Sequence, residues 1–121
     1  NLQVLKTFAP SASIIYFMPP YEWYNEQITN WSKQEGLQLV NFTPGTGTNA
    51  DYTTPSMSNY RSSAQLYERL LDFEKKNPSR LNGAIVLIHL GTGPARKDKF
   101  YRRLPELIAE LKGRGYGFGR F

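Results

Sequence analysis

The sequence contains no cysteine and only one histidine, His89, among its 121 residues. The absence of cysteine excludes disulfides and thiolate chemistry, but it does not locate the protein, because exported bacterial proteins often lack cysteine too. A metal site built from several histidines is excluded in the same way. No apolar run approaches the roughly 20 residues that a membrane-spanning helix needs, so we expect no membrane span.

Basic residues are not in excess until the end of the chain. Residues 1–90 hold seven basic and seven acidic side chains, whereas residues 91–121 hold eight basic and three acidic ones. A nucleic-acid surface needs basic side chains on one face with stacking aromatics between them. The last helical pattern instead interleaves its charges with an apolar stripe: Phe100, Leu104, Leu107 and Leu111. We therefore expect the charged residues, Arg96 among them, to be solvent-exposed, and no nucleic-acid partner.

Strand and helix patterns alternate along the chain. Apolar and β-branched runs predict strands over residues 13–17, 37–43, 83–90 and 116–121. Helical periodicity and capping residues predict helices over residues 1–8, 25–35, 62–77 and 98–113. This alternation favours right-handed βαβ units and a mostly parallel sheet, which is an α/β fold.

Several details of these helices follow from single residues. Asn25 is a predicted cap, Gly36 a predicted stop, and Ile28 and Trp31 are expected to face inward between them. Asp98 is the expected cap of the last helix. Pro105 lies inside that helix, so we expect a kink or a fresh start near Arg103.

The run from Ala84 to Ile88 lies between glycines and reads as a strand buried on both faces, with His89 at its C-terminal end. Tyr21 and Asp51 likewise follow the ends of predicted strands. Because the carboxyl ends of parallel strands meet at one rim, these three residues are expected to lie together. A carboxylate fixes the tautomer of a neighbouring imidazole, which then serves as a general acid, and a loop N–H can bind an oxyanion. This combination indicates acyl hydrolysis.

A structural interpretation of the same residues stays open. In it His89 is a partly buried structural histidine, Asp51 a turn residue and Tyr21 a packing aromatic. A third interpretation is a small nucleotide-binding module, since residues 45–50 match G-x-G-x-x-A. No helix pattern follows that loop directly, and residues 91–94 lack the lysine of a P-loop, so both glycine loops are weak matches.

Three short stretches and the C-terminal tail resemble the polysaccharide deacetylase family, also known as the NodB-homology or carbohydrate esterase family 4 group. Residues 17–21, Phe-Met-Pro-Pro-Tyr, are similar to its Arg-Pro-Pro-Tyr motif, and Asp51-Tyr52 is similar to its Asp-Trp motif. Residues 87–89, Leu-Ile-His, match its Leu-x-His strand end. The tail of the family is a Leu-Pro-x-hydrophobic-Ile helix followed by Gly-Tyr-x-Phe, which residues 104–118 resemble.

The resemblance implies a role for each of these positions. His89 would protonate the leaving group, Asp51 would orient His89, and the Tyr21 backbone N–H would help to hold the oxyanion. The remaining implied residues would contact substrate: Leu87 and Tyr52 around the acetyl methyl group, and Trp23 by stacking on a sugar ring.

The chain departs from the family in two places. Met18 stands where the family has an arginine that pairs with the catalytic base, and methionine cannot hold a carboxylate. The family's upstream Asp-Asp and His-x-x-x-His motifs, which supply the base and the metal ligands, have no counterpart here. We therefore expect residues 1–121 to be a single partial domain, the C-terminal half of a distorted (β/α) barrel.

These observations lead to one expected function and one alternative. The expectation is part of a metal-dependent polysaccharide deacetylase acting on N- or O-acetylated glycans, inactive as the isolated fragment. Its divalent metal, zinc by resemblance, would be held in the missing N-terminal half, which another chain could carry. The resemblance also implies a location in the bacterial cell envelope or outside the cell. The alternative, motivated by Met18, is a non-catalytic carbohydrate-binding relative.

Overall fold

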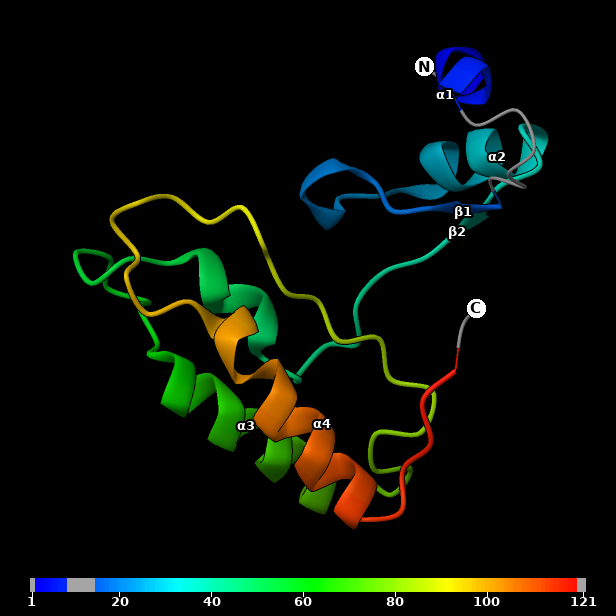
Figure 1. Ribbon diagram of the computed structural model, residues 1–121. Coiled ribbons are helices and arrows are strands. Elements are labelled where there is room, and N and C mark those ends of the chain that lie inside the picture. The colour runs from blue at the N-terminus through cyan, green and yellow to red at the C-terminus, as the bar shows by residue number, and fades with distance from the viewer. Residues whose placement is uncertain (1, 9–14, 120–121) are drawn as a thin grey trace. The chain divides into compact units, whose positions relative to one another are not determined.

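The computed structural model describes residues 2–8 and 15–119. The chain forms two compact units, the first comprising residues up to Asn41 and the second beginning at Phe42. Each unit has its own arrangement of helices and extended segments (Figure 1).

The first unit combines three helices with a two-stranded sheet. Strands β1 (Tyr16–Phe17) and β2 (Gln38–Leu39) are parallel, with Tyr16 opposite Gln38 and Phe17 opposite Leu39. Both strands are shorter than predicted, and residues 13 and 14 lie outside the described residues. The helices are α1 (Leu2–Phe8), the 3₁₀ turn η1 (Pro20–Glu22) and α2 (Glu26–Gln34).

Helix α2 begins and ends where the sequence predicts. The Asn25 side chain accepts a hydrogen bond from the Ile28 N–H at 2.9 Å. At the other end Gly36 has a φ of 73°, and the N–H groups of Gly36 and Leu37 donate to the Lys33 and Ser32 carbonyls, a Schellman motif. The inward orientation expected for Trp31 is wrong, because its side chain is 55% exposed.

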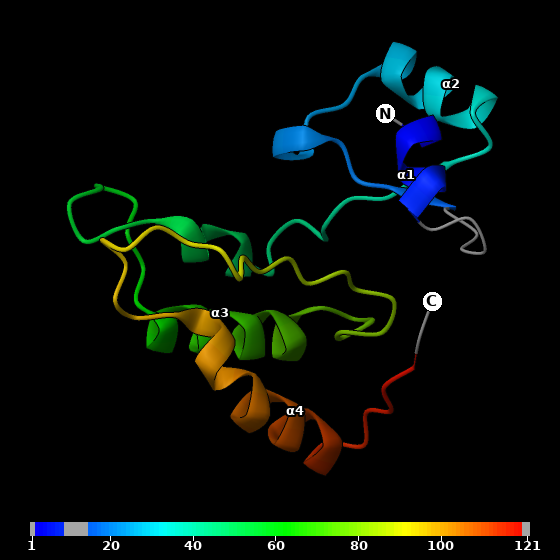
Figure 2. The ribbon, with the colours of Figure 1, turned by 45° about the horizontal axis from the view of Figure 1, so that its top comes forward.

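The second unit is built on two long helices. Helix α3 (Ser63–Lys76) and helix α4 (Leu104–Gly113) lie side by side in both views (Figures 1 and 2), with the 3₁₀ turn η3 (Phe100–Arg103) leading into α4. Their apolar side chains form the core of this unit: Leu66, Tyr67, Leu70, Leu71, Phe100, Leu107 and Leu111. The apolar stripe predicted for the last helix is therefore confirmed, with Leu104 partly buried beside it.

The ends of these helices show one predicted and one unexpected cap. Ser62 and Gln65 form the predicted capping box of α3. Asp98 was the expected cap of the last helix, and this prediction is wrong. Its carboxylate instead accepts a hydrogen bond from the Ser63 N–H at the start of α3. Pro105 occupies the first turn of α4, where its missing N–H has no intrahelical partner to lose, so the helix starts afresh after Arg103.

We expected the segment over residues 83–90 to be a strand buried on both faces. It is extended, but it forms no strand and is not buried on both faces. Its backbone hydrogen bonds include one from the Thr43 N–H to the Ile85 carbonyl, 2.9 Å, which is too few for a ladder. Val86 is 36% exposed, Leu90 is 71% exposed, and the other apolar side chains are half-buried. The predicted strand over residues 116–121 is likewise irregular up to residue 119, and its last two residues lie outside the described part.

A buried carboxylate ties the C-terminal segment to α3. Glu74, only 2% exposed, accepts hydrogen bonds from the Tyr116 hydroxyl at 3.0 Å and from Arg114 at 2.9 Å, with Arg80 at 3.4 Å. Burial by itself raises the pKa of Glu74, but these hydrogen bonds and positive charges outweigh it and lower that pKa below its ordinary value.

The described helices include none that is both long and apolar enough to cross a membrane. This agrees with the expectation drawn from the sequence.

Candidate active site

The candidate site lies in the second unit, where a 3₁₀ turn meets the extended segment. Asp51 belongs to η2 (Thr48–Tyr52) and is fully buried. One of its carboxylate oxygens lies 2.6 Å from Nδ1 of His89, and the other accepts the His89 backbone N–H at 2.9 Å. The two contacts fix both the position and the ring of His89. In Figures 1 and 2 the segment that carries His89 runs past η2.

This geometry leaves one ring nitrogen for chemistry. Because the carboxylate only accepts hydrogen bonds, Nδ1 of His89 carries the proton, and Nε2 is the atom that exchanges a proton. Nε2 makes no hydrogen bond with any of the described residues, and the His89 side chain is 35% exposed. A buried carboxylate behind a solvent-accessible imidazole is the arrangement that holds a general acid or base.

Tyr52 forms one wall beside the imidazole. Its ring is edge-on to that of His89, with centroids 5.7 Å apart and planes at 72°. The Tyr52 side chain is 49% exposed, so it borders the site without closing it. Leu87, two residues before His89, is half-buried in the extended segment.

The loop that follows His89 is held by a lysine. The Lys99 ammonium donates to the Thr92 carbonyl at 2.6 Å, to the Thr92 hydroxyl at 2.7 Å and to the Gly93 carbonyl at 2.8 Å. These bonds use all three donors of the ammonium group. The loop is therefore anchored without secondary structure.

Arg96 departs from the expectation of a solvent-exposed charge, because it is completely buried. Its guanidinium donates hydrogen bonds to the chain that follows Asp51 and to the chain just after Arg96, with acceptors that include the Thr53 and Asp98 carbonyls, each at 2.7 Å. Sequence reasoning missed this residue, since a charge run usually marks a solvated face. The only local signal was its place outside the periodic part of the last helix.

The glycines of residues 45–47 have a packing role. Gly45 and Gly47 adopt φ values of 94° and 79°, which favour glycine. A Cβ at Gly47 would lie 2.4 Å from the Arg69 side chain, and one at Gly45 would lie 3.2 Å from the Phe73 ring. Close approach to α3 therefore accounts for both glycines, without a bound phosphate.

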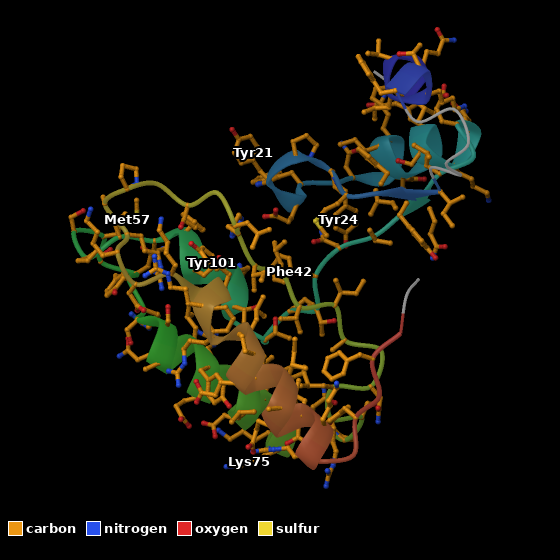
Figure 3. The ribbon with its side chains drawn as sticks, in the orientation of Figure 1. Tyr21, Tyr24, Phe42, Met57, Lys75 and Tyr101 are labelled. Carbon is orange, nitrogen blue, oxygen red and sulfur yellow. The ribbon has the colours of Figure 1, made fainter. Side chains whose placement is uncertain are left out.

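Tyr21 lies in the first unit, within η1. Tyr21 and Glu22 have φ values of 57° and 59°, a left-handed conformation that costs residues with a side chain roughly 1–2 kcal/mol each. The Asn41 amide donates to the Glu22 carbonyl at 2.9 Å and so supports this turn. The Tyr21 side chain is 87% exposed and points away from the turn (Figure 3).

Trp23 follows η1 in the same unit and is 79% exposed. It lines an apolar groove of about 430 Å³ together with residues of η1, α2 and their flanks: Phe17, Pro19, Pro20, Ile28, Trp31 and Leu37. The groove thus brings Trp23 close to a second exposed tryptophan. Flat aromatic faces of this kind stack on the apolar faces of sugar rings or on other apolar groups.

The described residues do not supply a metal site. Nowhere in residues 2–8 and 15–119 do three His, Asp or Glu side chains gather closely enough to hold an ion. Asp51 and His89 are the one carboxylate–imidazole pair, and its contacts occupy Nδ1 and both carboxylate oxygens.

No protein-family model, curated protein or solved structure matches this chain. Function therefore has to follow from the site itself.

Proposed function

We propose that this chain is part of a polysaccharide deacetylase that hydrolyses N- or O-acetyl groups of glycans, with His89 as its general acid. The observation that carries the proposal is the pair formed by Asp51 and His89. A fully buried carboxylate lies 2.6 Å from Nδ1 of an imidazole whose other nitrogen is free to reach solvent. The family resemblance of the surrounding residues supports the choice of an acetyl substrate.

The proposed step is the breakdown of the tetrahedral intermediate. After water has added to the acetyl carbonyl, protonated His89 donates the Nε2 proton to the leaving amine or hydroxyl oxygen as its bond to carbon breaks. Acetate and the free sugar group are the products. The negative charge of Asp51 stabilises the protonated imidazole before transfer and keeps Nδ1 protonated after it.

The base that takes a proton from water is not among the residues of this chain that form the site. We assign it, and the divalent metal, to the missing N-terminal half of the barrel, and we derive no step through the metal. Tyr52, beside the imidazole, is proposed to contact the acetyl methyl group, and Leu87 is proposed to line the same pocket. The same assignment implies an acetylated polysaccharide as the substrate, and a protein that lies in the bacterial cell envelope or is secreted.

The turn at Tyr21 supports the oxyanion role proposed for its backbone N–H. Two successive non-glycine residues with positive φ are unusual, and strained backbone of this kind is concentrated at functional sites. A rigid turn also presents an N–H without reorganisation when charge develops on the carbonyl oxygen.

The second candidate is a carbohydrate-binding relative without activity. The groove with two exposed tryptophans favours it, because such a surface binds sugar without any catalytic group. Met18 favours it too, since the family's arginine is absent at that position.

Acetate release by the full-length parent protein tests the two candidates. Chitooligosaccharides and acetylated xylan are the substrates, each with and without a chelator. We expect release that the chelator abolishes. His89→Ala should lower kcat by about 10²- to 10⁴-fold while sugar binding stays nearly intact. Leu90→Ala, at the exposed neighbouring position, is the matched control and should keep wild-type activity.

Two results would decide against the enzyme. Equal acetate release by His89→Ala and the wild type would remove the general acid from the mechanism. No release with any divalent metal, together with sugar binding that Trp23→Ala abolishes, would establish the carbohydrate-binding alternative.

A further inference from the structure

We propose that Arg96 is a positioning residue that holds Asp51 and His89 in register, an inference that rests on the proposed function of this pair. Arg96 follows His89 by seven residues and binds the backbone two residues after Asp51. Its guanidinium therefore holds the segment that follows Asp51 against the chain that continues from His89. Neither the resemblance nor the sequence pattern assigns it any role.

The contact on the Asp51 side is made at Thr53. Nη1 of Arg96 donates to the Thr53 carbonyl at 2.7 Å and approaches the Thr53 hydroxyl at 3.4 Å. Thr53 in turn closes the turn that holds Asp51, because its N–H and its hydroxyl both donate to the Ala50 carbonyl, at 3.0 and 2.7 Å. Movement of Thr53 therefore moves the turn in which Asp51 lies.

The contact on the His89 side runs through the loop between residues 90 and 95. The Arg96 N–H donates to the Gly93 carbonyl at 3.2 Å, and Lys99 holds the same carbonyl and Thr92. Nε of Arg96 donates to the Asp98 carbonyl at 2.7 Å, which folds the chain back after the loop. The far end of the loop is thus held by the backbone N–H of Arg96 and by Lys99, and the Arg96 side chain anchors the chain just after it.

The remaining N–H donors of the Arg96 guanidinium point to acceptors on a third segment, and the planar shape of the group allows all these contacts at once. Nη2 donates to the Arg61 carbonyl at 3.0 Å and approaches the Ser63 hydroxyl at 3.4 Å, and the Tyr60 ring lies 5.2 Å from the guanidinium carbon. Most acceptors are carbonyl and hydroxyl oxygens, and the nearest carboxylate, of Asp98, is 3.9 Å away. A lysine would keep the charge but reach only part of this set, because its ammonium lacks the fork.

A purely structural role would also explain a buried arginine, so the test needs a readout at the pair itself. His89 is the only histidine of the chain, so ¹⁵N-labelled histidine gives one imidazole signal set. Asp51 should hold the neutral ring in the Nδ1–H tautomer. The ratio of the Nδ1–H to the Nε2–H form measures how well the carboxylate and the ring are aligned.

The experiment compares Arg96→Met and Arg96→Lys with the wild-type chain, and Asp51→Asn defines the spectrum of a broken pair. Arg114→Met is the matched control, since it removes another hydrogen-bonded guanidinium of the same unit, at Glu74. We expect Arg96→Met to shift the tautomer ratio toward that of Asp51→Asn, Arg96→Lys to shift it part-way, and Arg114→Met to leave it unchanged. In the full-length parent, kcat should fall about 10- to 100-fold for Arg96→Met, with KM little changed.

Three results would overturn the proposal. The first is a wild-type tautomer ratio in folded Arg96→Met. The second is an equal shift in Arg96→Met and Arg114→Met, which would follow from general loss of stability. The third is a chain that stays unfolded even as Arg96→Lys, which would leave Arg96 a structural role only. A shift specific to Arg96 in a protein that releases no acetate would overturn the proposed function and leave the positioning role standing.

Discussion

Replacing Asp51 by asparagine tests the central contact of the site. The carboxylate is fully buried and accepts two hydrogen bonds from His89, one from the backbone N–H and one from Nδ1. Asparagine keeps one acceptor oxygen and turns the other into a donor, so the charge-assisted hydrogen bond to Nδ1 is lost. A hydrogen bond to a charged group contributes about 1.5–3 kcal/mol, and we expect the free energy of unfolding to fall by that amount.

The same substitution should change the proton on the imidazole. An amide N–H₂ opposite Nδ1 favours the tautomer with the proton on Nε2, and the ring is then no longer held as a ready proton donor. In the full-length parent, acetate release should fall by about 10²- to 10⁴-fold, a range that removal of general acid catalysis spans.

Urea unfolding measures the first effect and acetate release the second. Asp72→Asn is the control, because Asp72 lies on the exposed face of α3 and makes only a surface ion pair with Lys76. It should change stability by no more than about 0.5 kcal/mol and leave activity unchanged. An Asp51→Asn protein that loses stability but keeps its acetate release would limit Asp51 to a structural role. Wild-type stability in this variant would contradict the buried contact itself.

Two further predictions concern stability. Glu74 has a lowered pKa in the folded protein, so its contribution is present above its unfolded pKa, about 4.3, and is lost as the pH falls through the lower folded value. Urea midpoints measured from pH 6 down to pH 3 should therefore fall less steeply for Glu74→Gln than for the wild type. Equal slopes in the two proteins would contradict this. Glu68→Gln, at an exposed position of α3, is the control and should keep the wild-type slope. Gly47→Ala should lower the free energy of unfolding by about 1–2 kcal/mol through its positive φ, and by more if Arg69 cannot move aside. Gly93→Ala, with open space and no positive φ, should stay within about 0.5 kcal/mol of the wild type, and equal effects of the two substitutions would show that the turn at Gly47 is not strained.

Local structure could be predicted wherever the residues that cause it lie within the same short stretch of sequence. Asn25 and Gly36 bound α2, Ser62 and Gln65 start α3, and Pro105 sets the beginning of α4. The periodicity of the last helix also identified its buried side chains, because one face of an amphipathic helix has to leave water.

The sequence was a poorer guide to the segments that depend on distant neighbours. The run over residues 83–90 has the composition of a buried strand, yet strand formation needs partners along its edges. Among the described residues its backbone makes isolated hydrogen bonds, such as those with Thr43 and with the Asp51 carboxylate, and no ladder. The half-barrel fold and the deacetylase activity stay predictions, because the two short strands of the described residues do not define a barrel and the pair of Asp51 and His89 does not by itself define a substrate.

By itself, then, the sequence determined the boundaries of α2 and α3 and the end of α4, and it singled out His89 and Asp51 as residues whose types suit acid–base chemistry. Only the tertiary structure decided that they meet, since they are 38 positions apart and the distance of 2.6 Å between them is a product of folding. The structure also decided the place of Arg96. A guanidinium is costly to bury unless many acceptors converge on it, and those acceptors come from residues up to 43 positions away, which no local pattern can bring together.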